Sequence, residues 1–402
     1  MTDLQSRFYK AAIPYVMVYA VIWGVAIVAL PLLAGSDARA GLTFAMLNAG
    51  VALAAPLWGS FANRVPIGRL AFLITVLSTA AWLAVILLDG LFLPGLAFLF
   101  GLTAAGIFAL ATVQVTQIFP KPDWDIYIAR MQSLMTMGQV AGLAATAIYA
   151  GTAAGLPFLA AGVFASGYVW RQSLKQTVAA RPQIGRIAAA SHFPGIVHAH
   201  LTFLFRPAHL VHLAHPRVLT VICRFAFIML ACAPVYSVYP LMMKGAFAIE
   251  QSLASLIYSG STALMVAAFF LSGRVAKRFG PATATSIGAV AGIAAFALML
   301  LGLRFGINAA GAAGFALMVV LYAFAAVGMN DGVVGLVAPD KEGEVLGIAN
   351  TMMSIANILG GLFAGTLAAV YGYEALFWFG IVLSLAVLGL GLFMRKPRPP
   401  AA

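Results

Sequence analysis

Twelve long apolar stretches constrain the fold of this chain more than any other feature. Most of them reach the roughly 20 residues that an α-helix needs to cross the hydrocarbon core of a bilayer. Only 8% of the residues are charged, against about 25% in a soluble domain, so too few charges exist to cover a water-facing surface. The stretches also lack the polar–apolar alternation of transmembrane β-barrel strands. The sequence therefore predicts an all-α integral membrane protein with twelve transmembrane helices, at 11–33, 41–61, 69–88, 94–118, 130–151, 156–170, 218–241, 252–272, 282–303, 309–337, 346–370 and 375–394.

The basic residues are distributed unevenly between the two sides that these spans define. An even number of spans puts both termini on one side, and that side then carries 19 of the 23 Lys and Arg residues. Only Arg39, Lys244 and Arg304 fall on the other side, and Arg224 lies within a span. This asymmetry is typical of cytoplasmic loops. It predicts a multi-pass protein of the inner membrane with both termini in the cytoplasm, whose net charge of +12 faces anionic lipid rather than nucleic acid.

Residues 171–217 separate two halves of six spans each, so we expect a bundle at 1–170, a cytoplasmic linker at 171–217 and a second bundle at 218–402. The linker contains six basic residues and no acidic one, together with apolar side chains, which favours a helix lying on the inner leaflet. Its histidines suggest either metal binding or pH sensing, but no carboxylate or thiolate stands among them, and we expect no metal. They are His192, His198, His200, His209, His212 and His215.

A short basic segment occurs twice, 214 positions apart, which indicates that the chain contains two copies of one membrane unit. Each copy starts with glycine, continues after three residues with a polar residue and an arginine, and includes a second glycine. We expect each copy to be a short polar loop between two spans. The residues concerned are Gly59, Asn63, Arg64, Gly68 and Arg69 in the first copy, and Gly273, Lys277 and Arg278 in the second.

Two six-span halves, a basic central linker and this repeated segment resemble the major facilitator superfamily of transporters over nearly the whole chain. The resemblance implies two pseudo-symmetric six-helix bundles around a central cavity, a monomer without cofactor, and cavity walls from spans 1, 4, 7 and 10. It also implies that the two copies of the repeated segment are loops that gate the transport path. The usual aspartate of the segment is replaced by Asn63 and by Lys277. The arginines then either bind helix ends and lipid phosphates or serve only to anchor the topology. Residues 346–378 are more specifically similar to sugar-efflux and drug-efflux branches.

Asp331 is the only acidic residue within any predicted span, and Arg224 is the only basic residue well inside one. Each is six residues from the cytoplasmic end of its span, or roughly 9 Å deep. A charge at such depth costs at least about 2.5–3.5 kcal/mol, so it should be paired, neutralised or hydrated. We therefore predict an ion pair between Asp331 and Arg224. Two interpretations remain: a proton-operated switch, or a static structural pair.

Polar and aromatic side chains of the expected cavity-lining spans, with neighbouring amides, are candidates for substrate contact. Each also has an ordinary packing explanation, since intramembrane amides often join helices and aromatic stripes often fill cores. Phenols and amides around one ion pair suit a polar solute that carries little charge. The candidates are Tyr19, Trp23, Asn48, Gln114, Gln117, Tyr236, Tyr239 and Asn330.

These features favour a secondary active transporter that exports a small polar or amphiphilic solute, as an antiporter coupled to protons. One alternative is an importer of a metabolite or siderophore on the same fold, and another is a non-transporting sensor or scaffold. No phosphate-binding loop of an ATPase and no nucleophile or metalloprotease motif occurs, so we do not expect an enzyme.

Overall fold

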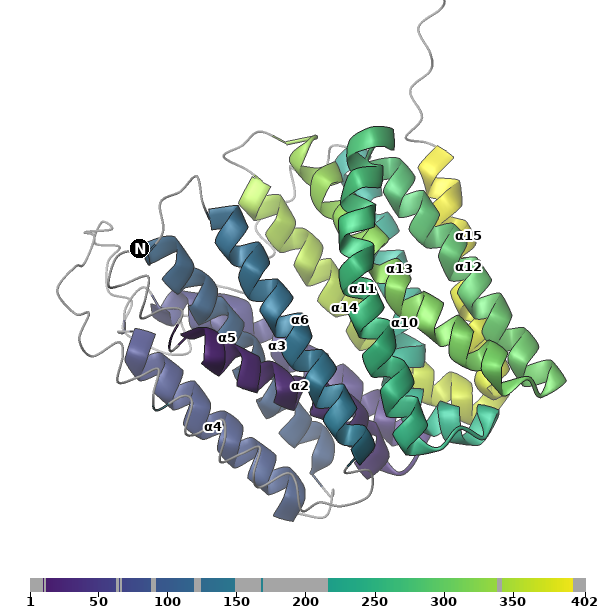
Figure 1. Cartoon of the computed structure of the whole chain (residues 1–402), viewed down its shortest axis with the longest axis horizontal. Coiled ribbons are helices and arrows are strands. Elements are labelled where there is room, and N and C mark those ends of the chain that lie inside the picture. The colour runs from purple at the N-terminus through teal and green to yellow at the C-terminus, as the bar shows by residue number, and fades with distance from the viewer. Residues whose placement is uncertain are drawn as a thin grey trace, which may run out of the picture. The chain divides into compact units, whose positions relative to one another are not determined.

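The computed structural model consists of long α-helices, and its described part contains no strand (Figure 1). The described residues are 10, 12–62, 65, 67–87, 92–118, 124–148, 168, 216–337 and 342–392. Eleven long helices in these ranges coincide with eleven of the twelve predicted spans. The sixth predicted span, 156–170, lies outside the described residues apart from Tyr168. The predicted all-α membrane class is confirmed.

The chain divides into two compact units. In the described part, unit 1 contains α2, the part of α3 from Met46 onward, and α4, α5 and α6. The tyrosine and tryptophan side chains of α2 pack on α4 and α5 in its interior. The bounds of these helices are α2 (Ile13–Ala34), α3 (Asp37–Ala62), α4 (Ile67–Leu87), α5 (Leu93–Ile118) and α6 (Trp124–Ile148).

Unit 2 contains the six remaining helices and, in addition, the segment Ala34–Ala45 at the start of α3. That segment falls within the predicted bundle 1–170 by sequence, while the predicted linker lies outside the described residues up to residue 215. Figure 1 shows the six helices, coloured teal to yellow, running side by side. Their bounds are α10 (Pro216–Phe247), α11 (Gln251–Phe279), α12 (Pro281–Phe305), α13 (Asn308–Val334), α14 (Glu342–Tyr371) and α15 (Tyr373–Leu392).

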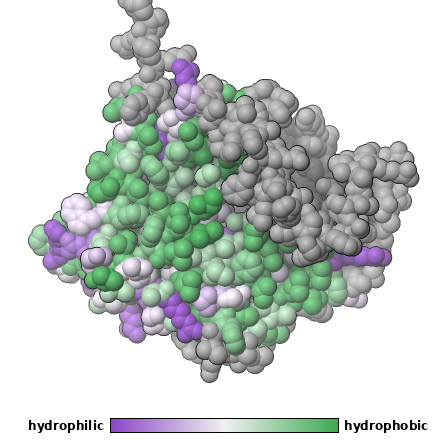
Figure 2. Space-filling view, turned by 180° about the vertical axis from the view of Figure 1, so that it is seen from behind, coloured by the Kyte–Doolittle hydropathy of each residue, from purple (hydrophilic) through white to green (hydrophobic). Residues whose placement is uncertain are grey.

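The outer surfaces of the helices are apolar. Eight of the described helices are long and apolar enough to cross a membrane. Large apolar side chains point away from the helix contacts: Phe270 is 70% exposed, Leu264 61% and Val382 60%. Figure 2 shows a predominantly hydrophobic described surface on one face, with hydrophilic residues in small separate groups. Such side chains would be costly in water and suit contact with lipid.

The second copy of the repeated segment is helical, so its prediction as a loop is wrong. α11 continues through Lys277 and Arg278 to Phe279, and the chain turns only at Gly280, where φ is +88°. Two cations in the last turn favour this extension because they face the negative end of the helix dipole. Gly273 therefore lies within the helix, and the exposed Lys277 and Arg278 sit at its end.

Glycines bring helices of unit 1 into backbone contact. A Cβ added to Gly101 of α5 would lie 3.2 Å from the backbone nitrogen of Val51 in α3 and would overlap the carbonyl of Leu47. A Cβ at Gly142 of α6 would lie 3.0 Å from Cα of Val21 in α2. In lipid, where burying apolar side chains between helices gains little, such close approach supplies much of the packing energy.

We predict that Gly101→Ala lowers the free energy of unfolding by about 1–3 kcal/mol, the usual cost of overpacking. Gly95→Ala on the same helix is the matched control, because a Cβ there meets nothing within 4 Å. Thermal unfolding of the purified variants in detergent measures both. Equal transition temperatures for the two variants would contradict the close contact between α3 and α5.

Candidate functional site

Arg224 lies in the interior of unit 2 and is only 1% exposed. It sits two turns into α10, and its guanidinium reaches α12 and α15. Its Nε donates to the carbonyl oxygen of Val387 at 3.1 Å, and its Nη2 donates to Oγ of Ser286 at 2.7 Å. Both Nη atoms also lie 3.4 Å from the carbonyl oxygen of Ala282. Neutral acceptors thus surround a charge that would otherwise be very costly to bury.

A glycine makes room for this guanidinium. A Cβ added to Gly391 of α15 would lie 3.0 Å from Nη2 of Arg224 and 3.2 Å from its Cζ. Neither Gly391 nor Ser286 was identified as a site residue from the sequence. A serine and a glycine within apolar spans are common, so only their contact with Arg224 distinguishes them.

Asp331 and Arg224 line one cavity of about 360 Å³ in unit 2. Its walls come from α10, from the start of α12 and from the end of α13. Gly328 and Gly332 place α13 close to Thr285 of α12 and to Val221 of α10, because neither glycine carries a Cβ to hold the helices apart. The Asp331 side chain is exposed at the end of α13.

The predicted ion pair between Asp331 and Arg224 does not form in this structure. Among the described residues, the acceptors of Arg224 are two main-chain carbonyls and a serine hydroxyl, and the Asp331 carboxylate is not one of them. The sequence placed the two charges at one depth, but it could not show that α12 and α15 offer nearer acceptors. The two side chains therefore share a cavity without a direct bond.

The aromatic candidates of unit 1 are packed in its interior. Tyr19 has no exposed surface; its hydroxyl lies 3.0 Å from Oγ of Ser78 on α4, and its ring stacks on Phe100 of α5. Trp23 is half-buried and stacks on the same phenylalanine, with ring centroids 5.9 Å apart. Within unit 1, Tyr19 joins α2, α4 and α5.

Unit 2 contains a comparable cluster around Phe315 of α13. Tyr239 has no exposed surface, and its hydroxyl donates to the carbonyl oxygen of Ala254 at 2.6 Å. Tyr236 stacks on Tyr258 of α11 with centroids 6.0 Å apart, and both meet the Phe315 ring edge-on. Phe315 and Phe100 each occupy the eighth position of their helices, in the two halves of the repeat.

The remaining candidates lie at varied places. Asn330 is exposed beside Asp331, and Asn48 is half-buried on α3.

The first copy of the repeated segment is described only in part. Arg69 is exposed and Gly68 is half-buried in the first turn of α4, and Gly59 falls within the last turn of α3. The side chains of Gln114 and Gln117 on α5, and residues Asn63 and Arg64, lie outside the described part of the chain, as do the six linker histidines. Within the described residues, no three His, Cys, Asp or Glu side chains lie close enough to hold a metal ion.

Two units of long apolar helices, with a lipid-compatible surface and a buried charge beside a cavity, define a polytopic membrane protein of the transporter class. The chain belongs to the major facilitator superfamily, whose sequence pattern matches residues 13–331 and 221–402. No curated protein matches the sequence. Membership confirms the resemblance seen in the sequence and identifies a secondary transporter that works by alternating access rather than an enzyme.

Solved structures of transporters share this fold at low sequence identity. The nucleoside transporter NupG is 14% identical with a TM-score of 0.70, over 98% of this chain and 100% of that one. A bacterial homologue of the human lysosomal transporter Spinster, in an inward-facing and unoccupied conformation, is 14% identical with a TM-score of 0.66, over 98% and 95% of the two chains. An auto-inhibited peptide transporter of the POT family is 15% identical with a TM-score of 0.66, over 98% and 99%.

We predict that Arg224→Met lowers the free energy of unfolding of unit 2 by about 1–3 kcal/mol. The serine hydroxyl and the carbonyls that accept hydrogen bonds from Arg224 then lose their donor. Arg217→Met is the control, since Arg217 is exposed in the first turn of the same helix. Thermal unfolding in detergent compares the two variants. A transition temperature unchanged by Arg224→Met would show that its hydrogen bonds contribute nothing to stability.

Proposed function

We propose that the protein exports a small polar or amphiphilic solute across the cytoplasmic membrane in exchange for protons. The observation that carries this proposal is the cavity shared by Asp331 and Arg224. An exposed carboxylate at a cavity wall can take up a proton, and a buried guanidinium nearby responds to whether that carboxylate is charged.

The hydrogen bonds of Arg224 suggest what the proton would change. In the present conformation Arg224 holds α10 to α12 and α15. An ionised Asp331 attracts the guanidinium toward α13, and a protonated Asp331 leaves it with Ser286 and Val387. The two protonation states of Asp331 therefore favour contacts of α10 with different helices. Such a difference in contacts is what allows a proton to shift the equilibrium between two conformations.

The proposed solute is polar and carries little charge. The proposed substrate contacts are the amides of Asn48, Asn330, Gln114 and Gln117, while the phenols of Tyr19 and Tyr239 form hydrogen bonds within their own units. Amides donate and accept hydrogen bonds and so suit hydroxyl-bearing or heterocyclic solutes. The likeness of residues 346–378 to efflux branches supports export, and NupG shows that this fold serves a nucleoside transporter.

The proposed topology has both termini in the cytoplasm of an inner-membrane monomer. Its support is the excess of Lys and Arg on that side, which includes Lys277 and Arg278 at the end of α11. These exposed cations are proposed to contact lipid phosphates.

We predict that Asp331→Asn abolishes proton-coupled transport while the protein still folds, because asparagine keeps the size but cannot take up a proton. Proteoliposomes loaded with a pH dye report proton movement when sugars, nucleosides, lipophilic cations, amino acids or siderophores are added, one class at a time. Glu250→Gln is the control, since Glu250 is exposed before α11 and lies away from the cavity.

The outcomes separate the candidate functions. Proton movement that depends on Asp331 supports coupling. A rise in the internal pH when solute is added outside indicates exchange of solute for protons, and a fall indicates co-transport. Solute equilibration without proton movement makes the protein a facilitator, in which Asp331 is structural. If neither proton movement nor solute equilibration is detected, the sensor or scaffold function is favoured.

A further inference from the structure

The exposed side chains from Leu264 to Arg278 share one face of α11. At 100° per residue they fall within an arc of about 140°. The opposite face of the helix packs on α13, where Ala268 lies in one buried cluster with Ala323 and Phe324. We call the exposed set the outer face of α11. It consists of Leu264, Ala267, Phe270, Leu271, Arg274, Lys277 and Arg278.

The outer face changes from apolar to basic within one helical turn. Phe270 is 70% exposed and Leu271 53%, and Arg274 follows one turn after Phe270, about 6 Å further along the axis. Lys277 and Arg278 complete a group of three cations. A phospholipid has the same order of chemistry, because its apolar chains are joined to a phosphate at one end. The outer face therefore matches a lipid molecule in polarity along its length.

An aromatic ring restrains one of these cations. The guanidinium of Arg278 lies over the ring of Phe279, 5.2 Å from its centroid, and Phe279 is 59% exposed. A cation over the face of an aromatic ring is attracted to it. The charge of Arg278 is therefore held at the end of the helix, which lowers the entropy that an incoming anion would have to remove.

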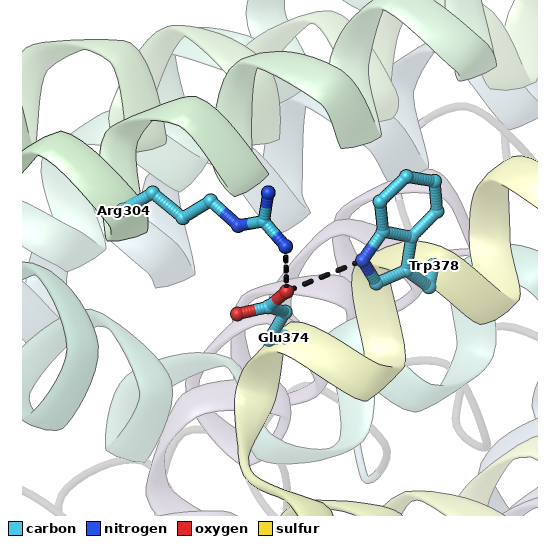
Figure 3. A network of polar contacts seen from close by, with 3 residues as sticks. All are labelled: Arg304, Glu374 and Trp378. Atoms are coloured by element: carbon cyan, nitrogen blue, oxygen red, sulfur yellow. Dashed lines mark hydrogen bonds and ion pairs between the residues drawn. The ribbon is translucent and has the colours of Figure 1, made fainter.

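The chain supplies no counter-charge for these three cations in its described part. None of them pairs with a described carboxylate, and neither α11 nor α12 contains an acidic residue. The negative end of the α11 dipole amounts to only roughly half an elementary charge, far less than three cations carry. At the opposite end of α12, by contrast, Arg304 pairs with Glu374, whose carboxylate also accepts from the indole nitrogen of Trp378 at 3.3 Å (Figure 3). The excess charge on the outer face thus favours an anionic lipid over a zwitterionic one.

The same cations adjoin a turn that forms one wall of the cavity. Gly280, whose φ is +88°, joins α11 to α12, and it lines the cavity together with Pro281 and Ala282. The carbonyl oxygen of Ala282 accepts from Arg224. The first turn of α12 has no acidic residue and no side-chain cap, so its positive end adds to the attraction for an anion. A ligand held by the three cations would therefore restrain this turn and the cavity wall.

We propose that the outer face of α11 binds one anionic phospholipid, with its phosphate among the three cations and an acyl chain along Phe270 and Leu271. The bound lipid holds the Gly280 turn and so steadies the cavity wall next to Arg224. Such a site needs only the membrane class of the protein and not the proposed export, so it can be tested without a transported solute.

Native mass spectrometry of the full-length protein in detergent tests the site, as phosphatidylglycerol or phosphatidylcholine is titrated. One phosphatidylglycerol should bind in preference to phosphatidylcholine. Lys277→Gln should weaken its binding about fivefold, the effect of one basic residue near a lipid phosphate, and replacing all three cations by glutamine should abolish the preference. Lys244→Gln is the matched control, because Lys244 is an exposed lysine in the last turn of α10, as Lys277 is in α11.

Three results would refute the lipid site. One is equal binding of the two lipids, and another is a loss in Lys277→Gln no larger than that in Lys244→Gln. The third is displacement of the lipid by an equal concentration of soluble glycerol 3-phosphate, which would show a site for a free anion in which the acyl chain takes no part.

Hydrogen exchange tests the effect on the turn. In nanodiscs that contain phosphatidylglycerol, the amides of Arg274–Thr285 should exchange about fivefold more slowly than in phosphatidylcholine alone, which corresponds to one cation–phosphate contact. The variant that lacks the three cations should show no difference between the lipids. The amides of Glu374–Trp378 are the internal control, since their cation is already paired. Equal exchange of the turn in both lipids would overturn its restraint by the lipid.

Discussion

Close backbone contact at glycines is the constraint on which both units depend. Lipid tails are as apolar as leucine, so helices gain little from hiding apolar side chains from them, and packing must come from near approach. Gly101 of α5 approaches α3, Gly142 of α6 approaches α2 and Gly328 of α13 approaches α12, each to distances that a Cβ would prevent. Because the backbone bonds are satisfied within each helix, these contacts can form and separate without exposing unpaired polar groups.

In the function proposed here, the buried charge of Arg224 is what lets this helix packing respond to a proton. Gly391 leaves space for the guanidinium, and α12 and α15 supply neutral acceptors for it. Asp331 stands across the same cavity on α13, held near α12 by Gly328. A charge with neutral acceptors on one side and an acid on the other has two nearby arrangements of its hydrogen bonds. A static ion pair has only one such arrangement.

Much of the architecture could be predicted from the sequence, because the length of each apolar stretch and the positions of the basic residues are visible without knowledge of the tertiary contacts. Asp331 and Arg224 were identified for the same reason, since a charge in an apolar run is conspicuous. Their bonding could not be predicted, because the carbonyls of Val387 and Ala282 carry no sequence signal. Tyr19 and Tyr239 could not be assigned to an interior or a cavity, since either face of an apolar helix accepts a phenol. The end of α11 was missed because its basic residues resemble a loop, although they also favour the last turn of a helix.

The spacing of two acceptors fixes the face that α12 presents to Arg224. The carbonyl of Ala282 and the hydroxyl of Ser286 both reach the guanidinium because four residues, about one helical turn, separate them. Inserting or deleting one residue between them would rotate one acceptor by about 100° relative to the other, so that it would no longer face the guanidinium. Evolution can therefore exchange the residues between them far more readily than it can alter their number, and the length of this stretch becomes a heritable property of the buried charge.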